Sequence, residues 1–163
     1  MHRATKVELL GLAGFSVALY ALSVEMHMDE EGYEAMCDIG QFFSCTAVFK
    51  SSYGHILSHW GVLPPGHPLD LSLALVGMLL YGAYFIAGAI WNSIPCRAAL
   101  FLAVSSSGAL FSTYLLYVLK FILGDFCIVC TCFHAINFSM FALAIVEARD
   151  TGLLRMRPKP KTG

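Results

Sequence analysis

Four long apolar stretches limit what this chain can fold into. They cover residues 7–24, 69–91, 98–119 and 126–146, and the last two contain no Asp, Glu, Lys or Arg. A helix needs about 20 mostly apolar residues to cross the hydrocarbon core of a bilayer. We therefore predict an all-α integral membrane protein, in which residues 1–163 form one domain built as a bundle of four transmembrane helices.

The composition supports the membrane class. Hydrophobic residues make up 58% of the chain and charged residues 13%, whereas about 25% of an ordinary soluble domain is charged. The net charge of −1 gives no general attraction to nucleic acid, so we expect membrane lipid as a partner and no nucleic acid. The first apolar stretch follows a basic start, as in a signal peptide, but its end offers a poor cleavage site, which favours a retained helix.

Basic residues predict the orientation, because short flanks rich in Lys and Arg tend to stay cytoplasmic. Arg3 and Lys6 precede the first stretch, Arg97 joins the second to the third, and five more basic residues lie in the tail, residues 149–163. The connection of residues 25–68 holds six acidic residues and a single lysine. We predict that both termini are cytosolic and that residues 25–68 form a long lumenal loop between the first and second helices.

The cysteines can be compared with this topology. Cys37 and Cys45 lie in the long loop, and the Cys127-Ile-Val-Cys130 motif opens the fourth helix at the same face. Thiols are oxidised on the lumenal side. Two dithiol couples are therefore expected on that face, and the remaining cysteines, at positions 96 and 132, fall outside them.

The C-x-x-C motif at a helix start favours redox chemistry. The helix dipole and the unpaired N–H groups favour a thiolate there, and a thiolate is both the nucleophile and the leaving group of disulfide exchange. Cys127 and Cys130 are also neighbours on the helix surface. A permanent disulfide and two ordinary buried cysteines remain alternatives. A zinc site that includes His134 lacks an obvious fourth ligand, so no metal is expected.

Two cysteine motifs carry a resemblance to a known family. One is Cys37-Asp38-x-Gly40-x(3)-Ser44-Cys45, and the other is Asp125-Phe126-Cys127-Ile128-x-Cys130. With neighbouring matches between residues 11 and 146, the chain resembles the vitamin K epoxide reductase family. The resemblance implies a multi-pass enzyme of the endoplasmic reticulum membrane, of the warfarin-sensitive type, that reduces vitamin K epoxide, its quinone, or both. It also implies thioredoxin-like lumenal thiol proteins as reductants and no tightly bound cofactor.

The family resemblance assigns a role to each cysteine. Cys130 is expected to face the substrate ring, and Cys127 to close a disulfide with Cys130 as the substrate is reduced. Cys45 is then expected to attack Cys127, and Cys37 to resolve the resulting mixed disulfide. The loop pair, left oxidised, would be reduced by a lumenal protein.

A lipid quinone needs an apolar pocket with a few polar groups. By the resemblance, we expect the wall to include Phe49, Leu73, Val76, Leu80, Leu115, Leu119, Leu123 and His134. Helix packing or lipid contact is the alternative for each aliphatic residue.

Leu73 and His134 depart from the family pattern, which usually places Asn and Tyr there to hydrogen-bond the substrate oxygens. A leucine cannot donate a hydrogen bond, whereas an imidazole can. The preference between epoxide and quinone therefore stays open. Two further functions also stay open, a quinone-linked oxidase that generates disulfides in secretory proteins and a non-enzymatic scaffold stapled by disulfides.

Overall fold

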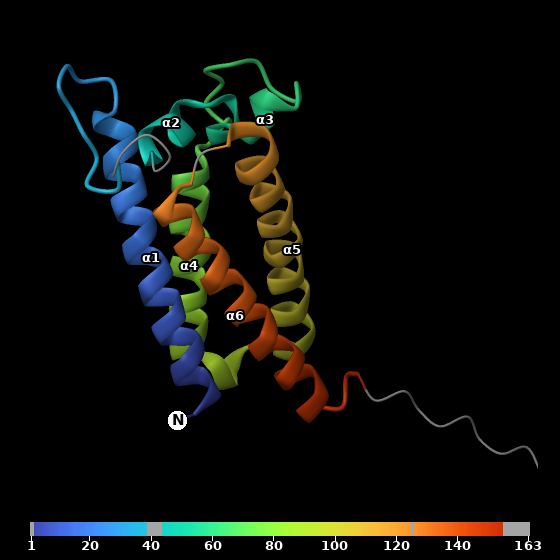
Figure 1. Cartoon of the computed structure of the whole chain (residues 1–163). Coiled ribbons are helices and arrows are strands. Elements are labelled where there is room, and N and C mark those ends of the chain that lie inside the picture. The colour runs from blue at the N-terminus through green and yellow to red at the C-terminus, as the bar shows by residue number, and fades with distance from the viewer. Residues whose placement is uncertain (1, 39–43, 125, 155–163) are drawn as a thin grey trace, which may run out of the picture.

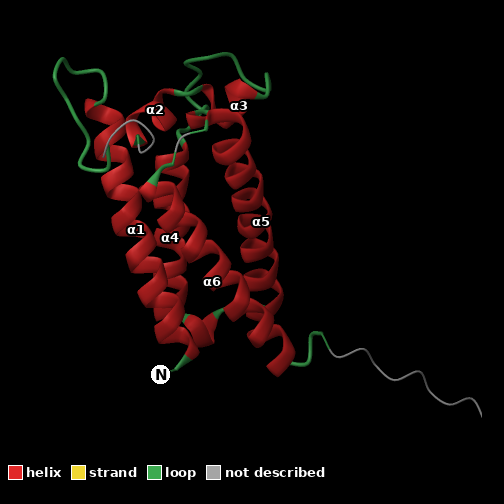
Figure 2. Ribbon diagram, in the orientation of Figure 1, coloured by secondary structure: helices red, strands yellow, loops and turns green. Residues whose placement is uncertain are grey.

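Every regular element of the described chain is a helix. The computed structural model describes residues 2–38, 44–124 and 126–154. In these ranges, four long helices lie side by side (Figure 1), and the remaining residues form short helices and loops (Figure 2). The long helices are α1 (Arg3–His27), α4 (Leu73–Ala89), α5 (Arg97–Tyr117) and α6 (Ile128–Asp150).

Short helical segments sit at both ends of the long helices. At the end drawn uppermost in Figure 1 lie α2 (Cys45–Lys50), η1 (Ser52–Gly54) and α3 (Ile56–His59), and at the opposite end lies η2 (Trp91–Ser93). A π-helix, η3 (Val118–Leu123), continues α5. Gly124 ends η3 with a φ of 71°, a left-handed conformation that glycine adopts without steric cost.

Among the described helices, three are long and apolar enough to cross a membrane. They are Arg3–His27, Arg97–Leu123 and Ile128–Asp150, whereas Leu73–Ala89 is apolar but has 17 residues. The all-helical, apolar architecture agrees with the predicted class of membrane protein. Whether the shorter helix also crosses is taken up under the proposed function.

A local interaction determines where the shorter helix, α4, starts. The predicted stretch began at residue 69, but the hydroxyl of Ser72 accepts a hydrogen bond from the backbone N–H of Leu75 at 3.2 Å and caps α4 there. Asp70 instead accepts a hydrogen bond from the backbone N–H of Ser58 at 3.1 Å, which holds the preceding segment in the loop. At the other end, the helix gives way to η2 after Ile90.

The other long helices extend beyond the predicted stretches. The first predicted stretch, 7–24, lies inside α1, and the third, 98–119, lies inside α5 and η3. The fourth, 126–146, starts two residues before α6, which continues to Asp150 and so takes in the first residues of the predicted tail. The rest of that tail, from residue 155 onward, lies outside the described residues.

Glycines let α1 and α4 pack backbone to backbone. A Cβ atom on Gly11 of α1 would come within 2.6 Å of the backbone nitrogen of Phe85 in α4. A Cβ on Gly88 would likewise come within 2.9 Å of the backbone of Glu8. Gly82, on the same pair of helices, has more room, because its Cβ would lie 3.6 Å from the ring of Phe15. The close approach is therefore limited to particular positions along the interface.

Gly11→Ala is expected to destabilise the protein, by about 1–3 kcal/mol, because the added methyl group forces two backbones apart. Gly82→Ala is the matched control, since its methyl group meets only an ordinary van der Waals contact and alanine favours a helix over glycine. Thermal unfolding in detergent measures both variants. Equal unfolding midpoints for the two variants would contradict the close packing of α1 on α4.

Candidate functional site

The loop between α1 and α4 carries a disulfide between Cys37 and Cys45, with a Cα–Cα distance of 5.9 Å. Cys45 begins α2, where the preceding Ser44 caps the helix by accepting a hydrogen bond from the N–H of Ala47 at 3.1 Å. The hydroxyl of Tyr20 in α1 donates to the Cys37 sulfur at 3.7 Å. The disulfide is thus held between the short helix α2 and the long helix α1.

A second link runs beside this disulfide. Asp38 follows Cys37, and its carboxylate accepts hydrogen bonds from the hydroxyl of Thr46 at 2.5 Å and from its backbone N–H at 3.2 Å. Burial raises the pKa of Asp38, but these hydrogen bonds, with others from Cys45 and Ser44, outweigh burial, so that the pKa lies below its ordinary value. The carboxylate therefore stays ionised at neutral pH and keeps the two cysteines together by a non-covalent route.

The C-x-x-C motif lies directly against the loop disulfide. Cys127 caps the start of α6, and its sulfur accepts a hydrogen bond from the backbone N–H of Cys130 at 3.3 Å. The same sulfur lies 3.4 Å from the sulfur of Cys45. Both of these cysteines are fully buried within a cluster of apolar side chains. Two groups that can exchange a disulfide are therefore already in contact and shielded from water.

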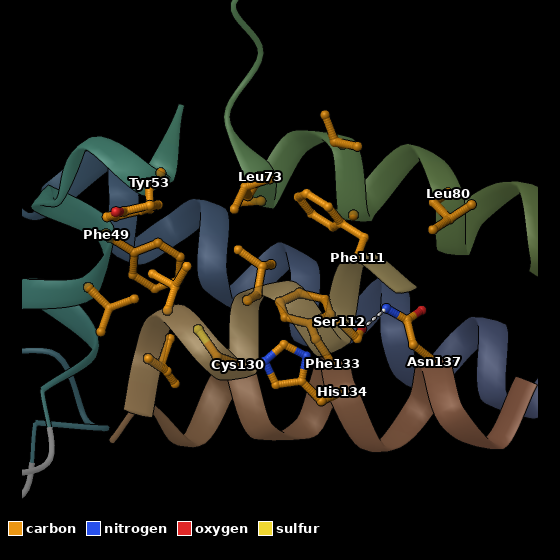
Figure 3. A pocket seen from close by; sticks show the side chains of 18 of the residues that line it. Phe49, Tyr53, Leu73, Leu80, Phe111, Ser112, Cys130, Phe133, His134 and Asn137 are labelled. Atoms are coloured by element: carbon orange, nitrogen blue, oxygen red, sulfur yellow. Dashed lines mark hydrogen bonds between the residues drawn. The ribbon is translucent and has the colours of Figure 1, made fainter. Parts of the chain in front are cut away.

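Cys130 connects this cysteine group to a cavity. It lies one turn into α6 and borders a cavity of about 130 Å³ between α2, α4, α5 and α6 (Figure 3). The walls are mostly leucine, valine and phenylalanine side chains. The cavity is therefore suited to an apolar, ring-shaped ligand that has its reactive atoms beside the Cys130 thiol.

All eight side chains predicted for the pocket wall line this single cavity. They come from α2, α4, α5, η3 and α6, and they are Phe49, Leu73, Val76, Leu80, Leu115, Leu119, Leu123 and His134. Their contact with a substrate stays a prediction, as do the roles of the four cysteines. The π-helix contributes to this convergence, since its wider turn brings Val118, Leu119 and Leu123 to the same wall.

His134 is the polar group of the wall that lacks a partner. It is 4% exposed, and neither nitrogen of its ring has a hydrogen-bond partner among the described residues. A buried polar group without a partner costs free energy. An oxygen atom of a bound ligand could accept a hydrogen bond from the ring N–H and remove part of that cost.

Sequence analysis missed a polar network in the same wall. The hydroxyl of Tyr81 in α4 donates to the side-chain oxygen of Asn137 in α6 at 3.0 Å, and the Asn137 amide donates to the hydroxyl of Ser112 in α5 at 2.7 Å. All three residues line the cavity. Asn137 follows Cys130 by seven residues, two helical turns further along the same face. That spacing, together with the amide inside an apolar stretch, was the signal that could have found it.

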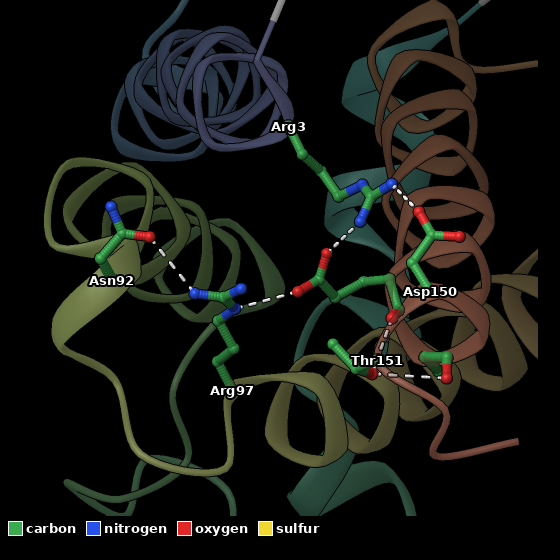
Figure 4. Close-up of polar contacts among 7 residues, drawn as sticks. Arg3, Asn92, Arg97, Asp150 and Thr151 are labelled. Atoms are coloured by element: carbon green, nitrogen blue, oxygen red, sulfur yellow. Dashed lines mark hydrogen bonds and ion pairs between the residues drawn. The ribbon is translucent and has the colours of Figure 1, made fainter.

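A charged cluster at the opposite end of the long helices is separate from the cavity (Figure 4). Glu147 of α6 is 2% exposed and pairs with Arg3 of α1 and, at 2.9 Å, with Arg97 of α5. Arg3 also pairs with Asp150 at 2.5 Å. These ion pairs join three of the long helices at the end far from the loop disulfide and the C-x-x-C motif.

The other cysteines do not take part in the group described above. Cys96 and Cys132 are free and exposed. In the described chain, one group of side chains has ligand atoms close enough to hold a metal ion, within 4.8 Å of one another: Cys37, Asp38 and Cys45. Two of these ligands are bonded to each other as the disulfide, so only the reduced protein could offer them to a metal.

The comparisons with known proteins agree with this geometry. A model of the vitamin K epoxide reductase family matches residues 7–145. The chain is 34% identical over 148 residues to vitamin K epoxide reductase complex subunit 1 of Mus musculus, and 37% identical to the protein of that name in Rattus norvegicus. Each match covers 86% of this chain and 88% of the relative. The chain belongs to the vitamin K epoxide reductase family. It is thus a membrane oxidoreductase of the vitamin K epoxide reductase type.

The contact between the Cys45 and Cys127 sulfurs predicts which cysteines can pair. In a Cys37→Ala, Cys130→Ala double variant, we expect Cys45 and Cys127 to form a disulfide under mild oxidation, because only a small movement separates 3.4 Å from bonding distance. The matched control is Cys37→Ala with Cys127→Ala, which leaves Cys45 and Cys130 and should not give a linked pair. Non-reducing mass spectrometry of peptides measures both. Preferential linkage of Cys45 to Cys130 would contradict the geometry.

Proposed function

We propose that this protein is a thiol:quinone oxidoreductase that reduces vitamin K epoxide, its quinone, or both, in the cavity beside Cys130. The observation that carries the proposal is a continuous run of sulfur atoms. It passes from the loop disulfide through the 3.4 Å contact of Cys45 with Cys127 to Cys130 at the cavity wall.

The electrons come from thiols in each step. Cys130, as a thiolate, attacks the substrate ring, and Cys127 then attacks the Cys130 sulfur. Together the two thiols supply two electrons and two protons, and they become a disulfide. A quinone is thereby reduced to a hydroquinone, or an epoxide to a quinone and water. No tightly bound cofactor is needed for this chemistry.

The relay restores the reduced C-x-x-C pair. Cys45, reduced, attacks Cys127 and releases Cys130, and Cys37 then attacks Cys45 and releases Cys127. The backbone N–H of Cys130 points at the Cys127 sulfur, which stabilises the thiolate released in that last step. The loop pair ends as the Cys37–Cys45 disulfide, and a thioredoxin-like lumenal protein reduces it.

We propose that all four long helices cross the membrane. A helix of 17 residues is roughly 25 Å long, somewhat short of the hydrocarbon thickness of about 30 Å. Apolar residues flank α4 on both sides, Leu71 before it and Ile90 and Trp91 after it, and they add to its apolar length. Four crossings place both termini on the same side of the membrane, which the basic flanks indicate is the cytosol. Cys37, Cys45, Cys127 and Cys130 then face the lumen of the endoplasmic reticulum.

The enzyme assignment predicts that substitutions in the two cysteine pairs affect activity differently. Cys127→Ala or Cys130→Ala should lower quinone reduction to the uncatalysed background even with dithiothreitol, because the pair that contacts substrate is lost. Cys37→Ala should keep most of the dithiothreitol-driven activity but lose the activity driven by a thioredoxin-like protein. Cys132→Ala, an exposed cysteine of α6, is the control and should match the wild type. If all of these variants keep wild-type rates, the protein is a scaffold and the proposal is wrong.

His134 predicts a second effect. Its ring is buried against the cavity without a partner, so we expect it to donate a hydrogen bond to a substrate oxygen. His134→Phe should lower kcat/KM for the quinone roughly 3- to 30-fold, the equivalent of one lost hydrogen bond in an apolar site. His134→Tyr restores a donor and should recover most of that loss. Steady-state kinetics with dithiothreitol measure the change, and an unchanged kcat/KM in His134→Phe would exclude this role.

Leu73 predicts the substrate preference. It lies in the cavity wall where the family usually has an asparagine, and it offers no hydrogen bond. Leu73→Asn should raise epoxide turnover relative to quinone turnover. Leu80→Asn, at another leucine of the same wall, is the control. An equal ratio of the two activities in Leu73→Asn and the wild type would show that this position does not set the preference. Sensitivity to warfarin stays a prediction.

A further inference from the structure

We propose that Asn137 is a second oxygen-binding group of the cavity, and that the site therefore holds a quinone ring with its two para oxygens placed along α6. This inference rests on the proposed function, because it takes a quinone as the ligand. It assigns a role to a residue outside both cysteine motifs.

Three cavity residues share one face of α6. Cys130, His134 and Asn137 are spaced by four and by three residues, so they follow one another along the helix surface. Figure 3 shows their side chains pointing to the same side of the helix, into the space lined by Phe49, Leu80 and Phe111. His134 and Asn137 are three residues apart, or about 4.5 Å along the axis. That separation is comparable to the distance between the para oxygens of a quinone.

Two hydrogen bonds, one at each end of the side-chain amide, fix the orientation of Asn137. Its oxygen accepts from the Tyr81 hydroxyl at 3.0 Å, and its nitrogen donates to the Ser112 hydroxyl at 2.7 Å. Tyr81 and Ser112 are each 1% exposed, so water does not compete for them. An amide nitrogen carries two hydrogens, and Ser112 takes one of them. The second remains for a ligand in the cavity that this amide lines.

His134 points to a ligand rather than to helix packing alone. The network of Tyr81, Asn137 and Ser112 joins α4, α5 and α6, which by itself fits a structural role. The neighbouring His134 is buried with both ring nitrogens unpartnered, which packing does not explain. A ring with two oxygens would take one hydrogen bond from His134 and one from Asn137.

The leucine at position 73, where the family usually has an asparagine, supports this placement of the ligand oxygens. Leu73 lies on the α4 wall and has no donor to offer. The two donors that the proposal assigns to the ligand, His134 and Asn137, both belong to α6. A ligand that carries two carbonyl oxygens satisfies both donors, whereas a ligand with one leaves a donor unpaired, which costs binding free energy.

The test compares two ligands. Menadione has two carbonyl oxygens, and a methyl-tetralone keeps one of them. Binding of each to the purified oxidised protein in detergent is measured as a dissociation constant. Wild-type protein is expected to bind menadione roughly three- to tenfold more tightly than the tetralone, as one further hydrogen bond predicts. Asn137→Leu should weaken menadione binding by about the same factor and leave tetralone binding within about twofold, so that the preference disappears.

Controls separate this role from a structural one. Asn92→Leu removes the asparagine that bonds Arg97 outside the cavity, and should leave both dissociation constants unchanged. Ser112→Ala keeps the Asn137 amide and should retain a preference for menadione. The inference is overturned if Asn137→Leu binds menadione as wild type does, or if it loses affinity for both ligands equally, as a misshapen cavity would. If the wild type fails to reduce menadione, the proposed function is wrong. The binding result can still be read in that case, because it requires no turnover.

Discussion

The contact between the sulfurs of Cys45 and Cys127 joins a loop to a membrane helix, and the chemistry of the rest of the site depends on it. The sulfurs are 3.4 Å apart, whereas a disulfide bond is about 2.05 Å long. Exchange therefore needs a movement of the order of 1 Å. Both sulfurs are fully buried, so the proposed movement would take place within a cluster of apolar side chains.

The proposed relay must survive the breaking of its own disulfide. When Cys37 and Cys45 are reduced, the covalent link between the two parts of the loop is lost, but the hydrogen bonds between Asp38 and Thr46 remain beside it. They keep the two thiols near each other, so that Cys37 can resolve a mixed disulfide rapidly. Because the pKa of Asp38 is lowered in the folded protein, this stabilisation is present at neutral pH and is lost as the pH falls through that lowered pKa.

Sequence analysis predicted the parts of this site that depend on local pattern. Apolar length indicated the helices, and the family motifs indicated the eight side chains that line one cavity. It did not find the network of Tyr81, Ser112 and Asn137, because each residue lies on a different helix and tertiary packing brings them together. It also placed the start of the second apolar helix too early, since hydropathy does not register the Ser72 cap.

The two ends of the long helices differ in the contacts that they make. At the end far from the loop disulfide, Glu147 pairs with Arg3 and Arg97, and near it Gly88 brings the backbones of α1 and α4 together. These contacts fix the helices where no chemistry occurs. At the other end, the start of α6 meets the short helix α2 through the contact between Cys127 and Cys45, so a small shift of α2 would bring the two sulfurs to bonding distance. The cavity lies between the two ends, with the Cys130 thiol toward the loop disulfide and the Asn137 amide further along α6. In the proposed mechanism, a ring bound there would keep its position against Asn137 while the sulfur atoms exchange bonds beside it.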